Sequence, residues 1–157
     1  MRQPLELTLT HHAWEEISRH AVDSFPEECC GVILSNGIVD EVRRLRNIQN
    51  QLHAVDRKSY PRDATTAYNI DPRELEPILH EGKIAGGTLK AFYHSHPNHE
   101  AYFSAEDRES ATPFGEPTYP DCAQIVISIY DRTVRRICAY AWSDDKKEFV
   151  EVPLRII

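Results

Sequence analysis

The histidine pair His94 and His96, followed directly by Pro97, constrains this chain more than any other part of its sequence. Side chains alternate between the two faces of a β-strand, so both imidazoles are expected to project from one face of one strand. Pro97 cannot donate a ladder hydrogen bond and is expected to end that strand, which leaves the imidazoles at its rim. Asp107 follows eleven residues after His96, which is close enough for the chain to fold back and place its carboxylate beside the two imidazoles. Two imidazoles and one carboxylate leave a zinc coordination position for water, which is the pattern of a catalytic metal site.

Each part of this pattern also has a purely structural interpretation. A His-x-His pair can be two hydrogen-bonded surface histidines. Ser104 and Asp107 are spaced as the two partners of a helix capping box, with Ser104 as the N-cap. The ligand and capping interpretations of Asp107 are compatible, because a helix N-terminus is a rigid place to mount a ligand. His99, beyond Pro97, is expected to be a loop or rim residue rather than a ligand.

A carboxylate suited to act as a base occurs upstream, in the segment from Pro26 to Gly31. A helix pattern ends before the proline and an apolar, β-prone run begins near Cys30, so Glu28 is expected at a helix-to-strand junction. The order Pro-x-Glu-x-Cys-Gly, a long gap, His-x-His-Pro, and then Ser104 and Asp107 resembles the JAMM (MPN-plus) zinc metalloprotease family. The likeness is to the compact, prokaryote-like members of that family.

The resemblance implies an α/β (mixed) fold, in which a curved mixed β-sheet is flanked by helices in the cytidine-deaminase-like MPN/JAMM architecture. It implies that His94, His96 and Asp107 bind one Zn2+ ion. It further implies that Glu28 is the general base, which passes a proton from water to the leaving amine, and that Ser104 stabilises the tetrahedral oxyanion. Zinc lowers the pKa of its water to about 7 and a positioned carboxylate can shuttle the proton, so this division of roles is physically sound. The implied reaction is hydrolysis of a peptide or isopeptide bond at the C-terminal tail of a ubiquitin-like or sulfur-carrier protein.

Two neighbours of Glu28 are rival candidates. Glu27 is equally acidic, but the family pattern places one residue between Pro and Glu and therefore selects Glu28. Cys29 is the best candidate for a nucleophilic cysteine, although the metal constellation already supplies a nucleophile. Two other functions stay open at this point. Two histidines and a carboxylate also form the facial triad of non-haem Fe(II) enzymes, and an MPN-type domain can be a non-catalytic scaffold or binding module.

The composition agrees with a compact enzyme. A length of 157 residues suits one domain spanning residues 1–157. The net charge of −7 argues against a nucleic-acid-binding surface. No apolar run is long enough to cross a membrane, and the first residues lack the apolar region of a secretory signal, so a cytoplasmic location is expected. The four cysteines lack the paired spacings of a structural zinc site and are expected to be free thiols. The oligomeric state is left open.

Hydrophobic periodicity predicts alternating strands and helices. Strands are expected at residues 5–9, 31–34, 38–45, 88–94, 124–130, 134–142 and 148–156, and helices from Thr10 to Ser24, from Asp71-Pro72 onward, and briefly around Asp107. The polar segments 47–65 and 112–121 are expected to be loops that form the walls of a substrate site. The adjacent aromatics Tyr102 and Phe103 either line a peptide groove or form a hydrophobic staple on the following helix.

Overall fold

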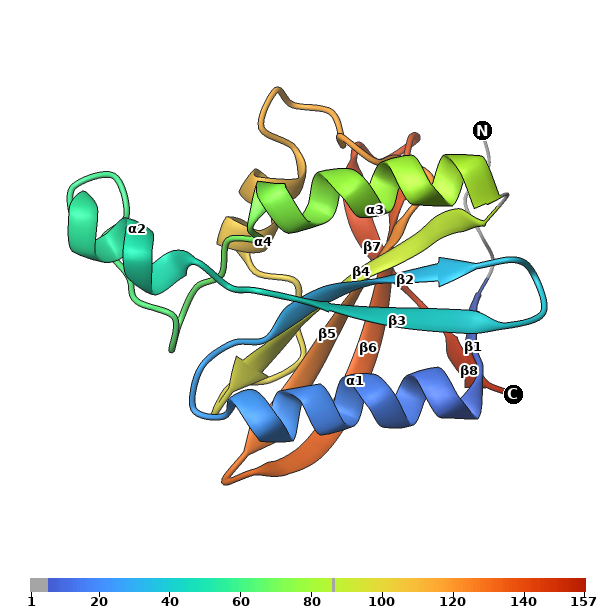
Figure 1. The fold of residues 1–157 in the computed structure, drawn as a ribbon, viewed down its shortest axis with the longest axis horizontal. Helices are drawn as coiled ribbons and strands as arrows, with labels where there is room; N and C mark the ends of the chain where they lie inside the picture. The colour runs from blue at the N-terminus through green and yellow to red at the C-terminus, as the bar shows by residue number, and fades with distance from the viewer. Residues whose placement is uncertain (1–5, 86) are drawn as a thin grey trace.

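The computed structural model describes residues 6–85 and 87–157 (Figure 1). Four helices and eight strands follow one another along the chain. Their order is β1 (Leu7–Leu9), α1 (His11–Ser24), β2 (Cys30–Ser35), β3 (Asp40–Leu45), α2 (Gln49–Val55), α3 (Pro72–Ala85), β4 (Thr88–Pro97), α4 (Ala105–Ala111), β5 (Ala123–Tyr130), β6 (Thr133–Ser143), β7 (Glu148–Val152) and β8 (Leu154–Ile156). No helix in these described ranges is long and apolar enough to span a membrane.

Six strands form one mixed sheet in the order β3-β2-β4-β5-β6-β7. Neighbouring strands in it are antiparallel except β4 and β5, which run parallel and leave α4 and a loop to make the crossover between them. Strands β1 and β8 pair separately, in parallel. The mixed α/β class predicted from the sequence is therefore confirmed.

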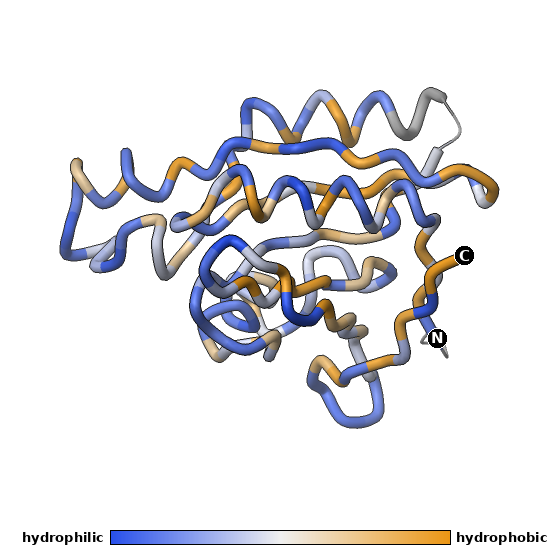
Figure 2. The backbone as a smooth tube through the Cα atoms, turned by 90° about the horizontal axis from the view of Figure 1, so that it is seen from below, coloured by the Kyte–Doolittle hydropathy of each residue, from blue (hydrophilic) through white to orange (hydrophobic). Residues whose placement is uncertain are grey.

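The two faces of the sheet are covered by different helices (Figure 1). On one face, Ile17 of α1 packs into a buried cluster with Tyr93 of β4. On the other face, Ile78 of α3 belongs to a cluster with Phe92, the neighbouring residue of the same strand. Because side chains alternate along a strand, His94 and the histidine two residues later follow Phe92 onto the α3 face. Figure 2 shows hydrophobic residues concentrated along the central strands, while the projecting α2 segment is mostly hydrophilic.

Several local signals gave the correct element boundaries. Thr10 is the N-cap of α1, where its hydroxyl accepts a hydrogen bond from the Ala13 amide. Pro72 is the first residue of α3, and the preceding Asp71 accepts a hydrogen bond from the Arg73 amide. Both arrangements satisfy amide groups that the first helical turn leaves without partners.

The expectation of an irregular loop over residues 47–65 was wrong, because this segment contains α2. The helix has no apolar stripe, and its one buried residue is the polar Gln49. The Gln49 side chain donates to the carbonyl of Arg62 at 2.8 Å, and its backbone amide donates to the side chain of Asn47 at 3.0 Å. Polar tertiary contacts hold α2, so hydrophobic periodicity gave no signal for it.

Two strand predictions also need correction. The first strand begins at Leu7, and the expected start at Leu5 lies outside the described residues. The last strand, expected over residues 148–156, is divided at Pro153 into β7 and β8. Pro153 has no amide hydrogen for a ladder bond, and the chain leaves the main sheet there to pair with β1.

The strand that carries the histidine pair is longer than the range 88–94 expected from periodicity. β4 continues to Pro97, which is its last residue, as the proline predicted. Both histidines lie near that end of the strand, paired with β5 through His94–Val126 and His96–Ser128. His94 is 0% exposed and His96 is 5% exposed, so both imidazoles are buried there.

Candidate active site

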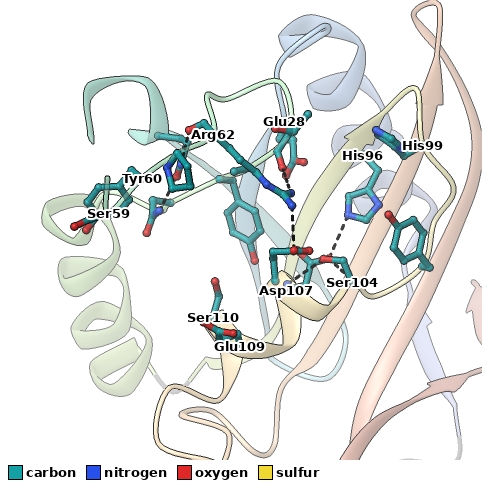
Figure 3. A pocket seen from close by; sticks show the side chains of 18 of the residues that line it. Glu28, Ser59, Tyr60, Arg62, His96, His99, Ser104, Asp107, Glu109 and Ser110 are labelled. Carbon is teal, nitrogen blue, oxygen red and sulfur yellow. Dashed lines mark hydrogen bonds and ion pairs between the residues drawn. The ribbon is translucent and has the colours of Figure 1, made fainter. Parts of the chain in front are cut away.

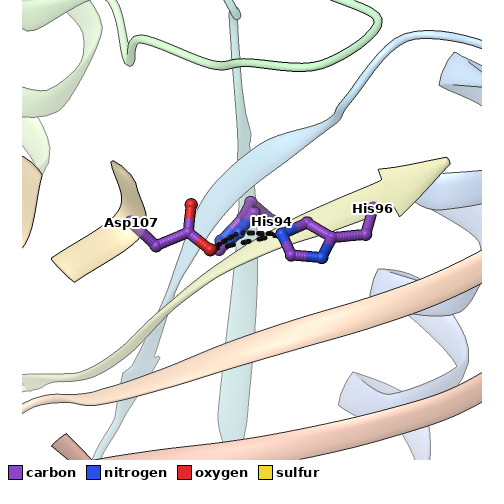
Figure 4. Close-up of side chains that lie close together, drawn as sticks. All are labelled: His94, His96 and Asp107. Atoms are coloured by element: carbon purple, nitrogen blue, oxygen red, sulfur yellow. Dashed lines mark hydrogen bonds and ion pairs between the residues drawn. The ribbon is translucent and has the colours of Figure 1, made fainter. Parts of the chain in front are cut away.

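Three potential ligands converge where α4 meets β4 (Figure 4). The Nε2 atom of His94 lies 3.1 Å from Oδ2 of Asp107, and the Nε2 atom of His96 lies 3.2 Å from the same oxygen. The two Nε2 atoms are 3.2 Å apart. All three residues are buried, and in the described part of the chain they form a cluster whose ligand atoms could hold one metal ion.

These separations suit a tetrahedral zinc site. Zinc about 2.0–2.1 Å from each ligand atom would set neighbouring ligands roughly 3.3 Å apart. Nδ1 of His96 lies 2.8 Å from the carbonyl of Glu100, which can only accept, so Nδ1 carries a proton and Nε2 is directed at Asp107. Burial by itself lowers the pKa of His96, but the Asp107 carboxylate outweighs this effect and raises it, so a proton on Nε2 can satisfy this contact in the metal-free protein. A metal ion between Nε2 and the carboxylate would take the place of that proton.

Asp107 is well suited to be an anionic ligand. Its burial by itself opposes ionisation, but the adjacent imidazoles of His94 and His96 outweigh this effect and hold the pKa of Asp107 well below its usual range. The carboxylate is also fixed mechanically. Its Oδ2 accepts a hydrogen bond from the amide of Ser104, while the Ser104 hydroxyl accepts one from the Asp107 amide. The capping box expected from the sequence is therefore present at the start of α4.

Glu28 lies beside this cluster because the next residue, Cys29, is hydrogen-bonded to Ser95 of β4. Ser95, between the two histidines, points to the opposite face, where its hydroxyl accepts from the Cys29 amide at 2.8 Å. The Ser95 amide donates to the Cys29 carbonyl at 3.1 Å. Glu28 precedes this double link, is 7% exposed, and lines the same cavity as His96 and Asp107. Burial raises the pKa of Glu28 to about 8.

The neighbours of Glu28 point elsewhere. Glu27 is exposed and accepts a hydrogen bond from Asn50 of α2. Cys29 is 2% exposed and packs in the core on the α1 face. Burial raises the pKa of the Cys29 thiol to about 12, so it has little thiolate near neutral pH. The geometry thus brings Glu28 to the cavity and leaves both rivals out of it.

The cavity is a cleft of about 870 Å³. Figure 3 shows Glu28, His96, Ser104 and Asp107 around it. One wall is the loop after α2 and the other is α4, and Arg62 of the loop reaches across to Glu106 of α4 at 3.0 Å. The segment 112–121, expected as a second wall, contributes only Pro113 among the described lining residues, and α4 takes that place. His99 lines the cleft as an exposed residue and lies outside the three-ligand cluster.

Of the two adjacent aromatic residues, Tyr102 lines the cleft and Phe103 packs in a hydrophobic cluster. Tyr102 is 50% exposed, lines the cleft, and meets the ring of His96 edge-on at 5.2 Å. Phe103 packs against Tyr140 and Phe149 in a small hydrophobic cluster.

No sequence pattern pointed to Tyr68 and Arg62, which also line the cleft. The ring of Tyr68 stacks on His94 with centroids 4.4 Å apart, and Arg62 spans the two walls. Both come from the irregular segment after α2, where no periodicity or motif marks a residue as functional. Ser95 was also missed as a positioning residue, although its place between two inward-facing histidines puts it on the opposite face.

Comparison with known proteins places the chain in a family. A family model described as prokaryotic homologs of the JAB domain matches residues 10–138. A desampylase from Haloferax volcanii is 29% identical over 154 residues, which cover 96% of each chain. A protein from Desulfitobacterium hafniense has a similar solution structure, with a TM-score of 0.70 at 23% identity over 96% of this chain and 92% of that one. A JAB1/MPN domain protein from Archaeoglobus fulgidus gives a TM-score of 0.57 at 15% identity over 98% of this chain and 100% of that one.

The two structural matches are below 25% identity and bear on the fold alone. The family match covers most of the chain and agrees with the order of motif residues in the sequence, so the predicted JAMM/MPN relationship is confirmed. This chain belongs to the family of prokaryotic homologs of the JAB domain.

Proposed function

We propose that this chain is a zinc-dependent isopeptidase, acting as one catalytic domain over residues 1–157. The observation that carries the proposal is the convergence of three buried ligand atoms, 3.1–3.2 Å apart, at the edge of a cleft that Glu28 also lines. This combination supplies a place for a metal, a nearby base and room for a polypeptide.

Each residue then has a specific role. His94, His96 and Asp107 would hold the zinc. Zinc at such a site acts as a Lewis acid and makes water a nucleophile near neutral pH. Glu28 takes the proton of the attacking water and returns it to the leaving amine. Ser104 donates its hydroxyl hydrogen to the oxyanion that develops on the scissile carbonyl.

The protonation state of Glu28 fits this cycle. In the metal-free protein, burial favours the neutral carboxyl and raises its pKa to about 8. A cation at the three ligands favours the ionised form that a base requires, because opposite charges lower a carboxyl pKa. A carboxyl with a pKa near the working pH is suited both to accept and to return a proton.

The substrate proposed is the C-terminal tail of a ubiquitin-like or sulfur-carrier protein, joined to an amine of a second protein. The name of the Haloferax volcanii relative, desampylase, supports this class. The cleft lies between a loop and a helix and has a volume of about 870 Å³, which leaves room for an extended chain. The four cysteines are buried and unpaired, as is usual in a reducing compartment, and we place the activity in the cytoplasm.

The test is cleavage of a defined conjugate, in which a ubiquitin-like protein ending in Gly-Gly is joined through an isopeptide bond to a fluorescent lysine peptide. We expect cleavage by the zinc-loaded protein, none after metal removal, and recovery when zinc is restored. Metal-independent cleavage would contradict the proposal. Tight binding of the conjugate without cleavage would indicate a scaffold, and oxygen uptake with Fe(II) and 2-oxoglutarate would indicate a non-haem iron enzyme.

A further inference from the structure

A second, smaller pocket opens beside the candidate active site. It has a volume of about 230 Å³ and shares Tyr68, Asn69 and Ser110 with the main cleft. Its other lining residues include Phe92 and Tyr119, whose rings are 4.9 Å apart. The pocket therefore has aromatic walls and opens next to the cleft where a substrate chain would lie.

Asn69, Ser110 and Thr118 also line this aromatic pocket, but Gln124 is the buried one of its described amide and hydroxyl-bearing side chains outside the tyrosines. Gln124 of β5 is 7% exposed, and in the described part of the chain its side-chain amide makes no hydrogen bond while it stays accessible to water in the pocket. The Gln124 amide therefore remains able to bind a polar group of a ligand.

The sheet register sets the distance from the pocket to the metal ligands. Gln124 pairs with Phe92 across β4 and β5, and the next pair on this face is Val126 with His94. Two residues along a strand span about 6.6 Å. A polypeptide bound in extended form at the metal ligands would thus bring a residue within about three positions of the cleaved bond to the pocket.

The lining of the pocket indicates the type of side chain that it can bind. A pocket of about 230 Å³ has room for one large side chain. The ring of a tyrosine suits the aromatic walls, and its hydroxyl suits the Gln124 amide.

We propose that this pocket is a specificity subsite that binds a tyrosine side chain of the substrate within three residues of the cleaved bond. The proposal rests on the proposed peptidase function, because the occupant belongs to the cleaved polypeptide. Binding of the side chain alone can still be measured without any cleavage, so the two claims can fail separately.

The binding experiment uses p-cresol, which is the tyrosine side chain as a free molecule, and follows by NMR the backbone amide resonances of the residues that line the pocket. We expect saturable shifts at millimolar p-cresol. Ala111→Phe should abolish them, because Ala111 lines the pocket and a phenyl group there would fill it. The control is Ala54→Phe, the same substitution at an exposed alanine of α2, which should leave binding unchanged. Gln124→Leu should weaken p-cresol binding by about three- to tenfold and leave toluene binding unaltered.

The cleavage experiment uses Gly-Gly tail conjugates that carry tyrosine, phenylalanine or alanine either at the third position before the bond, ahead of the two glycines, or beside the acceptor lysine. We expect one position at which tyrosine raises kcat/KM about tenfold over alanine, and we expect Ala111→Phe to remove that preference while still cleaving the alanine conjugate. Absence of saturable p-cresol shifts, or shifts that persist in Ala111→Phe, would overturn the subsite. Binding of p-cresol with no cleavage of any conjugate would support the pocket and refute the proposed function.

A second inference comes from a difference between the two histidines. Metal-binding histidines usually donate their other ring nitrogen to a hydrogen-bond acceptor, which fixes the ring orientation. His96 does so through Nδ1 and the carbonyl of Glu100, at 2.8 Å. Nδ1 of His94 is buried and has no partner in the described part of the chain.

The ring of Tyr68 restrains His94 in a different way, by stacking on the face of the imidazole. It lies against His94 with centroids 4.4 Å apart and ring planes inclined by 23°, which is a stacked arrangement. A buried imidazole held between a strand and an aromatic face cannot rotate freely about its side-chain bonds. We infer that Tyr68 is a positioning residue that orients His94 for the metal through ring stacking rather than through a hydrogen bond.

This inference is tested by zinc affinity, measured by competition with a chromophoric chelator. Tyr68→Leu should weaken zinc binding about tenfold, at the lower end of the effect of losing an outer partner of a metal ligand. Tyr68→Phe keeps the stacked ring and should restore affinity to within about twofold of wild type. The control is Tyr102→Leu, which removes the ring beside His96, a residue already held by Glu100, and should leave affinity unchanged.

A purely structural role for Tyr68 predicts a different pattern, in which Tyr68→Leu lowers the melting temperature of the metal-free protein without changing zinc affinity. That pattern would overturn the inference. Equal weakening by Tyr68→Phe and Tyr68→Leu would also overturn it, because the hydroxyl rather than the ring would then be responsible.

Discussion

Ser104 and Asp107 hold one another through reciprocal hydrogen bonds, each 3.0 Å long, at the N-terminus of α4. The oxygen of Asp107 that accepts from the Ser104 amide is Oδ2, the same atom that faces His94 and His96. A single carboxylate oxygen therefore closes the helix cap and completes the candidate metal site. This sharing makes the start of α4 and the proposed zinc centre mutually dependent.

Substitutions at Asp107 should separate the cap from the metal. Asp107→Asn keeps an oxygen that can accept from Ser104 but removes the negative charge, so zinc affinity should fall severely while the helix cap of the metal-free protein is retained. Asp107→Ala should lose both, with about 0.5–2 kcal/mol less stability from the missing cap. Zinc titration and urea unfolding of the metal-free variants measure the two effects. Wild-type zinc affinity in Asp107→Asn would remove this residue from the ligand set.

Ser104 allows the opposite separation. Ser104→Gly should melt within a few degrees of wild type and bind zinc normally, because glycine is tolerated at an N-cap at a cost of only tenths of a kcal/mol. Its turnover should fall by about 10²–10³, the usual effect of losing an oxyanion donor. Ser104→Ala should lose stability as well as turnover. Full activity in Ser104→Gly would limit Ser104 to its role as a helix cap.

Glu28 and Glu27 provide a matched pair for the base. Glu28→Gln preserves size and removes the proton acceptor, so zinc should stay bound while kcat falls by about 10²–10⁴. Glu27→Gln should change kcat little, because Glu27 is exposed and contacts Asn50 rather than the cleft. Zinc content and isopeptide cleavage are measured on both variants. Reversed phenotypes would assign the base to Glu27.

The raised pKa of Glu28 predicts a pH effect on the stability of the metal-free protein. The folded pKa is about 8 and the ordinary pKa of a glutamate is about 4.5, so the unfolded chain ionises at lower pH than the folded one. No penalty exists below about pH 4.5, the penalty grows as pH rises, and it is complete above about pH 8. The free energy of unfolding of wild type relative to Glu28→Gln should therefore fall by a few kcal/mol, as an order of magnitude, between pH 5 and pH 8. Urea unfolding at the two pH values measures it, and an unchanged difference would contradict a buried, neutral Glu28.

The sequence predicted the cluster of His94, His96 and Asp107 because its geometry follows from local rules. Alternation along a strand places His94 and His96 on one face, and the helix-capping pattern places Asp107 in the first turn of α4. Each rule acts over a few residues and needs no knowledge of the rest of the fold. The expected order of strands and helices followed from similar local patterns.

The parts that escaped prediction depend on contacts between distant segments. Stacking of Tyr68 on His94 and the hydrogen bond from Gln49 to Arg62 leave no periodic trace in the sequence. The role of Gly31 also appears only in three dimensions, because a Cβ there would come within 2.5 Å of the Tyr93 ring. The glycine of the family motif thus gives that buried ring its space against β2.

The most direct test of the account is a zinc titration of the metal-free protein with isopeptide cleavage as the readout. Activity should be absent at the start, rise linearly with added zinc, and reach a plateau at one equivalent, while His96→Ala should show no such break because two remaining ligands make an incomplete site. Cleavage that is unaffected by metal removal, or a His96→Ala variant that titrates like wild type, would contradict the assignment of this cluster as the catalytic zinc site.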